Sequence, residues 1–266
     1  KLINIVQVIK TFTHDKLAWL IMEECSYRDT KNFDTYYDLN SFFCKNTQPI
    51  DEVTKMSIVL QTANGMEYLH NNIVVHRDLK PTNILTKYWP NMNLPSDLLV
   101  KITDFGQSKF FNAHDDTSLM TSHVGSTPFR APELFETDVD QKLYYRKSID
   151  IFSMGLIWLA IIQAKGGQNL KPVAEGANTN FGEHRLEIGI VMNTRKFRKE
   201  PSFPVAVKNE GDSRMVRKLK GLINRMAVVE EHDVTRPSAN EVVAQLHSFD
   251  GVNNFSISFF TIFTHS

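Results

Sequence analysis

The hydrophobic residues follow two patterns along this chain, and the first, near its start, is typical of β-strands. The runs Asn4–Thr13 and Lys16–Glu24 are rich in β-branched and aromatic residues and flank the polar pair His14-Asp15. Two such runs around a short polar break are typical of a β-hairpin. We therefore predict a strand pair at the start of the chain.

From Asp51 onward the apolar spacing becomes helical. Apolar residues recur at intervals of three and four, which predicts one apolar helix face. They are Val53, Met56, Val59, Leu60, Ala63, Met66 and Leu69. Asp51 is a suitable N-cap because its short side chain can accept a backbone hydrogen bond. Residues 150–163 are apolar almost all round, which predicts a second helix buried in the core.

Shorter patterns complete the expected order of elements. Three β-prone runs follow the first helix, namely Ile73–Val75, Asn83–Thr86 and Leu98–Thr103, with a polar insert at 87–97. The segment 166–183 is rich in Gly and Asn and predicts a loop. Residues 217–226 have a helical pattern, and Ser238 with Glu241 forms a capping box that opens a last helix ending near His247. The fold class predicted is α+β, mainly helical after the first strand pair.

Composition is that of a globular protein. The 266 residues are 42% hydrophobic and 23% charged, and the formal net charge is zero, which gives no argument for DNA, RNA or anionic membrane binding. No apolar run reaches the roughly 18 residues of a membrane span. Two cysteines, Cys25 and Cys44, are few for a disulfide-stapled secreted protein, so we expect an intracellular location in the nucleus or cytoplasm.

Three short motifs carry recognisable chemistry. HRDLKPTN occupies residues 76–83, DFG residues 104–106 and APE residues 131–133. Each alone is weak, but all three in this order, between a long helix and a buried one, are specific. The chain resembles the eukaryotic protein kinases over residues 4–248. The resemblance implies a kinase-like fold, ATP as the phosphoryl donor and protein substrates.

The resemblance assigns roles to the residues that match these motifs. Asp78 is the base that orients the substrate hydroxyl, and Lys80 contacts the transferring phosphoryl group. Asn83 and Asp104 offer oxygen ligands to Mg²⁺, with Mn²⁺ as an alternative ion. A lysine at position 80 resembles serine/threonine kinases rather than tyrosine kinases. Ser126 stands where such kinases place a threonine that bonds both the base and the lysine.

The same resemblance assigns the residues that bind the adenine. Residues 19–25 look like the fifth strand of a kinase running into its hinge, so Met22 is the gatekeeper. Backbone groups of Glu23 and Cys25 are expected to bond adenine. Residues 38–40 match the start of the next helix, after an insert at 26–37.

Other matching residues are expected to support the site. They are His76, Arg77, Phe105, Gly106, Glu133, Asp150 and Arg236. Glu133 and Arg236 are expected to form a buried ion pair, whereas the plainer alternative is that Arg236 is an ordinary surface arginine. Asp150 is expected to hold the backbone of the catalytic loop, and a helix N-cap role for it is compatible with that.

Arg77, directly before the base, implies regulation through the activation segment 104–133, because an arginine there pairs with a phosphate that orders the segment. Ser122 matches the usual phosphorylated position best, and Thr121 follows. The alternative is that both are exposed loop hydroxyls with no regulatory role.

No G-x-G-x-x-G occurs in the sequence. The Gly-rich loop, the third-strand lysine and the C-helix glutamate of a kinase are expected upstream of Asn4, so we interpret residues 1–24 as a remnant of the N-terminal lobe. Residues 25–250 then form the C-terminal catalytic lobe, and 251–266 an apolar tail with no assigned role. We expect this truncated chain to bind ATP weakly and to have little activity.

The leading hypothesis is a monomeric serine/threonine kinase domain, and the first alternative is an impaired kinase or pseudokinase that acts as a scaffold. A small-molecule phosphotransferase is a weaker alternative, because such enzymes usually lack the APE motif. Residues 38–42, 203–208 and 215–226 resemble the nuclear and actin-associated kinases that bind PDZ-LIM proteins. The basic clusters 195–199 and 217–220 either aid nuclear import or are solvated faces.

Overall fold

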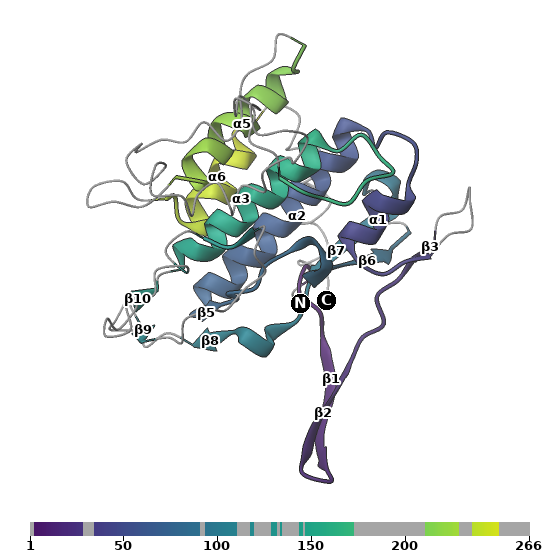
Figure 1. Ribbon diagram of the computed structural model, residues 1–266, viewed down its shortest axis with the longest axis vertical. Coiled ribbons are helices and arrows are strands. Elements are labelled where there is room, and N and C mark those ends of the chain that lie inside the picture. Colours follow the sequence, from purple (N-terminus) through teal and green to yellow (C-terminus); the bar gives the residue numbers. More distant parts are fainter. Residues whose placement is uncertain are drawn as a thin grey trace, which may run out of the picture.

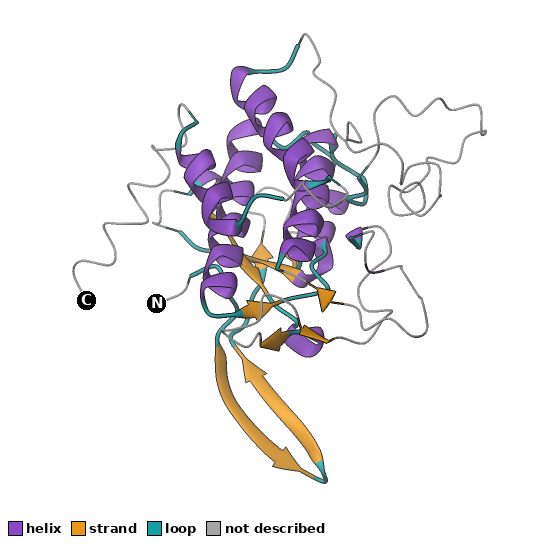
Figure 2. Cartoon of the chain, turned by 90° about the vertical axis from the view of Figure 1, so that its left-hand side faces the viewer, coloured by secondary structure: helices purple, strands orange, loops and turns teal. Residues whose placement is uncertain are grey.

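The computed structural model describes most of the chain and divides it into a helical body and a projecting hairpin (Figures 1 and 2). The described residues are 3–28, 35–90, 94–110, 118–119, 129–131, 134, 144–145, 147–172, 211–228 and 236–249. The helices are α1 (Leu39–Lys45), α2 (Glu52–Asn71), α3 (Ser148–Gln163), α5 (Arg214–Met226) and α6 (Ala239–His247). The short 3₁₀ turns are η1 (Pro81–Asn83), η2 (Pro95–Asp97) and η3 (Phe105–Gln107).

Ten short strands form five antiparallel pairs within the described residues. They are β1 (Val8–His14) with β2 (Leu17–Met22), β3 (Tyr27–Arg28) with β4 (Thr35–Tyr36), β5 (Val74–Val75) with β8 (Lys109–Phe110), β6 (Ile84–Tyr88) with β7 (Leu98–Ile102), and β9 (Ser118–Leu119) with β10 (Tyr144–Tyr145). The predicted α+β class and the predicted strand pair are therefore confirmed. The β3–β4 pair lies within the insert expected at 26–37.

Helix α2 forms the centre of the body, and Asp51 caps it as predicted, because its side chain accepts a hydrogen bond from the Thr54 backbone N–H at 2.8 Å. The prediction of a single apolar face was wrong. Gln61 is fully buried, whereas Val53 is exposed. The reason is that α2 is surrounded by α3, α6 and β7. Gln61 is accommodated because it donates to the Leu98 carbonyl and accepts from the Val100 N–H of β7.

Helix α3 is buried all round, as its sequence predicted, and packs between α2 and α5. The Trp158 indole N–H donates to the Thr62 hydroxyl of α2 at 2.9 Å, so both polar groups are satisfied in the core. The predicted capping box of α6 is present, with Ser238 and Glu241 each bonding the other's backbone N–H. In the described part of the chain, the helices are all too short or too polar to cross a membrane.

The β1–β2 hairpin turns at Asp15 and Lys16, one residue later than the predicted break, and His14 pairs with Leu17. Both turn residues have positive φ, which matches the twist of a two-residue hairpin turn. All residues of the two strands are exposed, and the only ring stacking between them joins Phe12 to Trp19. Figure 2 shows the hairpin extending away from the helices.

Candidate active site

Two antiparallel strand pairs bring the HRDLKPTN and DFG segments together. The first segment runs from β5 into β6, and the second lies between β7 and β8. Val75 pairs with Lys109 in one sheet, and Ile84 pairs with Ile102 in the other. The Thr103 N–H donates to the Asn83 carbonyl at 3.0 Å. Two segments that are separate in sequence therefore form a single site.

Three of the predicted catalytic residues are in direct contact. The Lys80 ammonium lies 2.7 Å from Oδ2 of Asp78. The Asn83 amide donates to the Asp78 carbonyl oxygen at 2.9 Å, and its Nδ2 lies 3.4 Å from Asp78 Oδ2. The lysine thus places a positive charge beside the carboxylate, while Asn83 fixes the backbone that carries it.

Asp104 follows β7 in a left-handed backbone conformation, with φ of 63°. Its side chain is exposed and accepts a long hydrogen bond from the Gly106 N–H at 3.4 Å. Asn83 and Asp104 supply oxygen donors, which suit Mg²⁺, and the described residues hold no cluster of three or more His, Cys, Asp or Glu. This donor set fits an ion that takes its remaining ligands from phosphates and water.

Asp150 anchors the backbone of the catalytic loop, as the sequence predicted. Its Oδ2 accepts the His76 N–H at 2.8 Å, and its Oδ1 accepts the Arg77 N–H at 2.9 Å. The His70 ring nitrogen lies 3.0 Å from Oδ2. Burial alone would raise the pKa of this carboxyl, but the His70 contacts and the Arg77 N–H outweigh it and lower the pKa. The N-cap alternative was wrong, because Asp150 lies inside α3, whose N-cap is Lys147.

Further contacts tie the loop to the DFG segment. The His76 ring nitrogen bonds the Thr103 carbonyl at 2.8 Å, and the ring packs against Phe105 with centroids 5.4 Å apart. Arg77 adopts a φ of 70°, and its Nε–H donates to the Gln107 carbonyl. Arg77 therefore contacts the start of the activation segment directly.

Arg236 is buried, so the surface-arginine alternative was wrong. Its side chain is 5% exposed, donates to the carbonyls of Val228 and Ser148, and lies 4.7 Å over the Phe152 ring. Four predicted site residues lie outside the described residues, and their roles stay predictions. They are Thr121, Ser122, Ser126 and Glu133.

Comparison with known proteins decides the family. The protein kinase domain model matches residues 1–248. This chain belongs to the protein kinase family. It is 33% identical over 72% of its length to a probable LRR receptor-like serine/threonine-protein kinase of Arabidopsis thaliana, covering 20% of that protein.

Two other relatives carry similar descriptions. The kinase chain is 33% identical over 61% of its length to serine/threonine-protein kinase VIK of Arabidopsis thaliana, covering 33% of it. It is 32% identical over 66% of its length to RGS domain-containing serine/threonine-protein kinase A of Dictyostelium discoideum, covering 14% of it. The chain therefore spans a third or less of the length of these relatives.

At Glu23, which directly follows β2, sequence reasoning missed an ion-pair cluster. Glu23 lies 2.7 Å from the Lys101 ammonium and 2.8 Å from that of Lys87. Burial would raise the pKa of Glu23, but hydrogen bonds from both lysines and the Gln7 N–H lower it to about 2. The signal was Lys101 itself, a charged residue within the apolar run 98–102 that needed a partner.

The two other residues expected at the adenine differ in exposure. Met22 ends β2 and is exposed, whereas Cys25 is buried. The adenine roles of Met22, Glu23 and Cys25 stay predictions.

Proposed function

We propose that this chain is the catalytic part of a serine/threonine protein kinase, which transfers the γ-phosphoryl group of ATP to protein hydroxyls. The observation that carries the proposal is the contact of Asp78 with Lys80 and Asn83, on a loop whose backbone is bonded to Asp150. Lys80 and the names of the three relatives support the serine/threonine class.

The reaction follows from these positions. Asp78 accepts a hydrogen bond from the substrate hydroxyl and takes its proton as the hydroxyl oxygen bonds to the γ-phosphorus. The bond from that phosphorus to the bridging oxygen breaks, and ADP leaves. Lys80 offsets charge on the transferring group. Asn83 and Asp104 would hold Mg²⁺, which offsets charge on the phosphates when bound.

A scaffold role is the second candidate. It is favoured by the β1–β2 hairpin, whose strands are exposed along their full length. The 266 residues contain no G-x-G-x-x-G loop, so we expect these residues tested alone to bind ATP weakly and to turn over slowly.

The narrower assignments are also proposals. We propose regulation through Ser122 or Thr121, a nuclear or cytoplasmic location and a monomeric state. The three relatives named above carry no description of PDZ-LIM binding, so that narrower resemblance stays a prediction.

A phosphotransfer assay with Mg-ATP and a serine-containing protein substrate tests the proposal. The 266-residue chain is compared with a version extended upstream by a Gly-rich loop and a third-strand lysine. We expect the extended chain to be active and Asp78→Asn to lower its rate at least about 100-fold. Asp15→Asn, in the exposed hairpin turn, is the matched control and is expected to leave the rate unchanged.

The same assay separates the two candidate functions. An extended chain with no phosphotransfer, or one in which Asp78→Asn keeps full activity, refutes the kinase proposal. Rapid turnover by the 266-residue chain refutes the expectation of low activity.

A further inference from the structure

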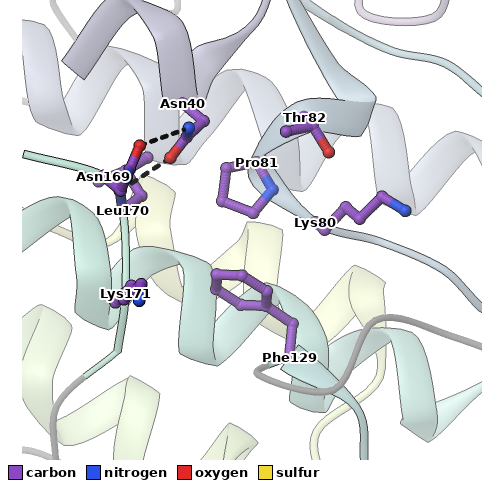
Figure 3. Close-up of a pocket in the computed structure, with 8 residues that line it drawn as sticks. All are labelled: Asn40, Lys80, Pro81, Thr82, Phe129, Asn169, Leu170 and Lys171. Atoms are coloured by element: carbon purple, nitrogen blue, oxygen red, sulfur yellow. Dashed lines mark hydrogen bonds between the residues drawn. The ribbon is translucent and has the colours of Figure 1, made fainter. Parts of the chain in front are cut away.

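A pocket of about 300 Å³ opens beside the catalytic loop, between that loop, α1 and the segment that follows α3 (Figure 3). Pro81, Phe129 and Leu170 provide its apolar lining. Phe129 and Leu170 are 6% and 3% exposed, so they form the floor of the pocket rather than protruding from its rim. Three distant parts of the chain therefore create an apolar hollow at the catalytic centre.

The wall after α3 is held in place by α1. The Asn40 amide donates to the Asn169 side-chain oxygen at 3.0 Å, and its oxygen accepts the Leu170 N–H at 2.9 Å (Figure 3). The Gly167 N–H also donates to the Asn46 carbonyl at 2.7 Å. These bonds connect the segment to both ends of α1, so Leu170 is fixed in the wall before a ligand arrives.

The charges around the pocket disfavour a basic ligand. Lys80 and Lys171 both line it, and no described lining residue carries a carboxylate. The Lys80 ammonium bonds Asp78, and Figure 3 shows it directed away from Phe129 and Leu170. The centre of the pocket is thus left to apolar contacts, and a substrate lysine or arginine would find no partner among these residues.

A residue that lines the pocket is close in sequence to the predicted base Asp78. Pro81 directly follows Lys80 and lies three residues from Asp78. An extended peptide advances roughly 3.3 Å per residue, so a peptide with its hydroxyl at Asp78 reaches the pocket within a few residues. A volume of about 300 Å³ accommodates one aliphatic side chain.

We propose that this pocket binds an apolar side chain of the protein substrate, of the size of leucine or methionine, near the serine or threonine that is phosphorylated. The inference rests on the proposed kinase function and adds a substrate preference to it. Replacing the anchoring leucine of a substrate by alanine is expected to weaken binding on the order of tenfold, because alanine gives up apolar contacts with Pro81, Phe129 and Leu170.

A peptide-binding experiment without ATP tests the pocket separately from catalysis. Fluorescent peptides with one serine carry a single Leu, Ala, Asp or Lys at each flanking position, and their binding to the 266-residue chain is measured by anisotropy. Leu170→Trp fills the pocket, and Leu170→Ala enlarges it. Lys171→Ala removes a rim charge and leaves the apolar floor intact. Thermal unfolding checks that each variant is folded. If Leu170→Trp does not fold, Leu170→Ala decides the result.

The expected result is a leucine preference at one flanking position, lost in Leu170→Trp and retained in Lys171→Ala. In Leu170→Ala, the leucine preference is expected to weaken, because part of the apolar floor is removed. Equal binding of the Leu and Ala peptides at all positions overturns the inference, as does tighter binding of the Asp or Lys peptide. A leucine preference that neither Leu170 variant changes also overturns it.

The phosphotransfer assay keeps the two proposals distinguishable. A leucine preference in the 266-residue chain, together with an extended chain that does not transfer phosphate, supports the pocket and refutes the kinase activity. Phosphotransfer without a leucine preference supports the activity and refutes the pocket.

Discussion

Replacing Asp150 by asparagine tests how the catalytic loop is held. The carboxylate accepts the N–H groups of His76 and Arg77 on its two oxygens, and His70 contacts one of them. Asparagine has nearly the same shape but only one oxygen. Whichever way the amide is turned, its NH₂ group faces a buried backbone donor, so at least one loop N–H loses its acceptor.

The expected cost follows from that lost bond. A hydrogen bond to a charged group is worth about 1.5–3 kcal/mol, and a buried unsatisfied donor costs about 1–3 kcal/mol. Arg77 also has a positive φ, which costs about 1–2 kcal/mol for a residue with a side chain. If the loop relaxes in the variant, this strain is relieved and offsets part of the loss. We therefore expect Asp150→Asn to lower the free energy of unfolding by about 2–4 kcal/mol.

Urea unfolding followed by tryptophan fluorescence measures this change, and Trp158 in the core is a suitable probe. Hydrogen exchange at the His76 and Arg77 amides reports the loop directly, and both are expected to lose protection. Ser153→Ala is the matched control on α3, since its hydroxyl bonds back to the Ile149 carbonyl of the same helix, and it should cost less than about 1 kcal/mol. A change below about 0.5 kcal/mol in Asp150→Asn, with amide protection retained, would refute the reasoning.

Two further predictions concern stability. Because the pKa of Glu23 is lowered to about 2, its stabilisation is complete above about pH 4.5 and is lost as the pH falls toward 2. The difference in unfolding free energy from Glu23→Gln should therefore shrink from at most roughly 3 kcal/mol as the solution is acidified, and a constant difference contradicts the Lys101 pairing. Gly166→Ala should destabilise by more than about 1 kcal/mol, since Gly166 has a φ of 87° and its Cβ would lie 2.6 Å from the Gln48 carbonyl. In the same unfolding assay the exposed Gly221→Ala in α5 should stabilise by roughly 0.5–1 kcal/mol, and equal effects of the two substitutions would contradict the assignment of strain.

Features that depend on residues close in sequence were predicted well. Asp51 caps α2 through Thr54, and Ser238 with Glu241 caps α6, because a helix brings residues three apart into contact. The apolar run of α3 identified a core helix for a similar reason, since no polar face was present.

Features that depend on distant contacts were predicted poorly. Gln61 is buried because β7 supplies its hydrogen-bond partners from 37 and 39 residues away. The spacing of residues within α2 gives no information about that strand. The pairing of Glu23 with Lys101 and the pocket at Phe129 and Leu170 arise in the same way. Each required the positions of elements that are far apart along the chain.

By itself, the sequence determined the α+β class and the main helices, and it predicted the site residues Asp78, Lys80, Asn83 and Asp104. Only the tertiary structure decided that the Lys80 ammonium lies beside Asp78 and that a pocket lined by Phe129 and Leu170 opens next to the loop that carries them. The physical reason is that the residue type sets whether a side chain can donate or accept a hydrogen bond and whether it carries a charge. Burial and partners are set by chain segments that meet only in the folded protein.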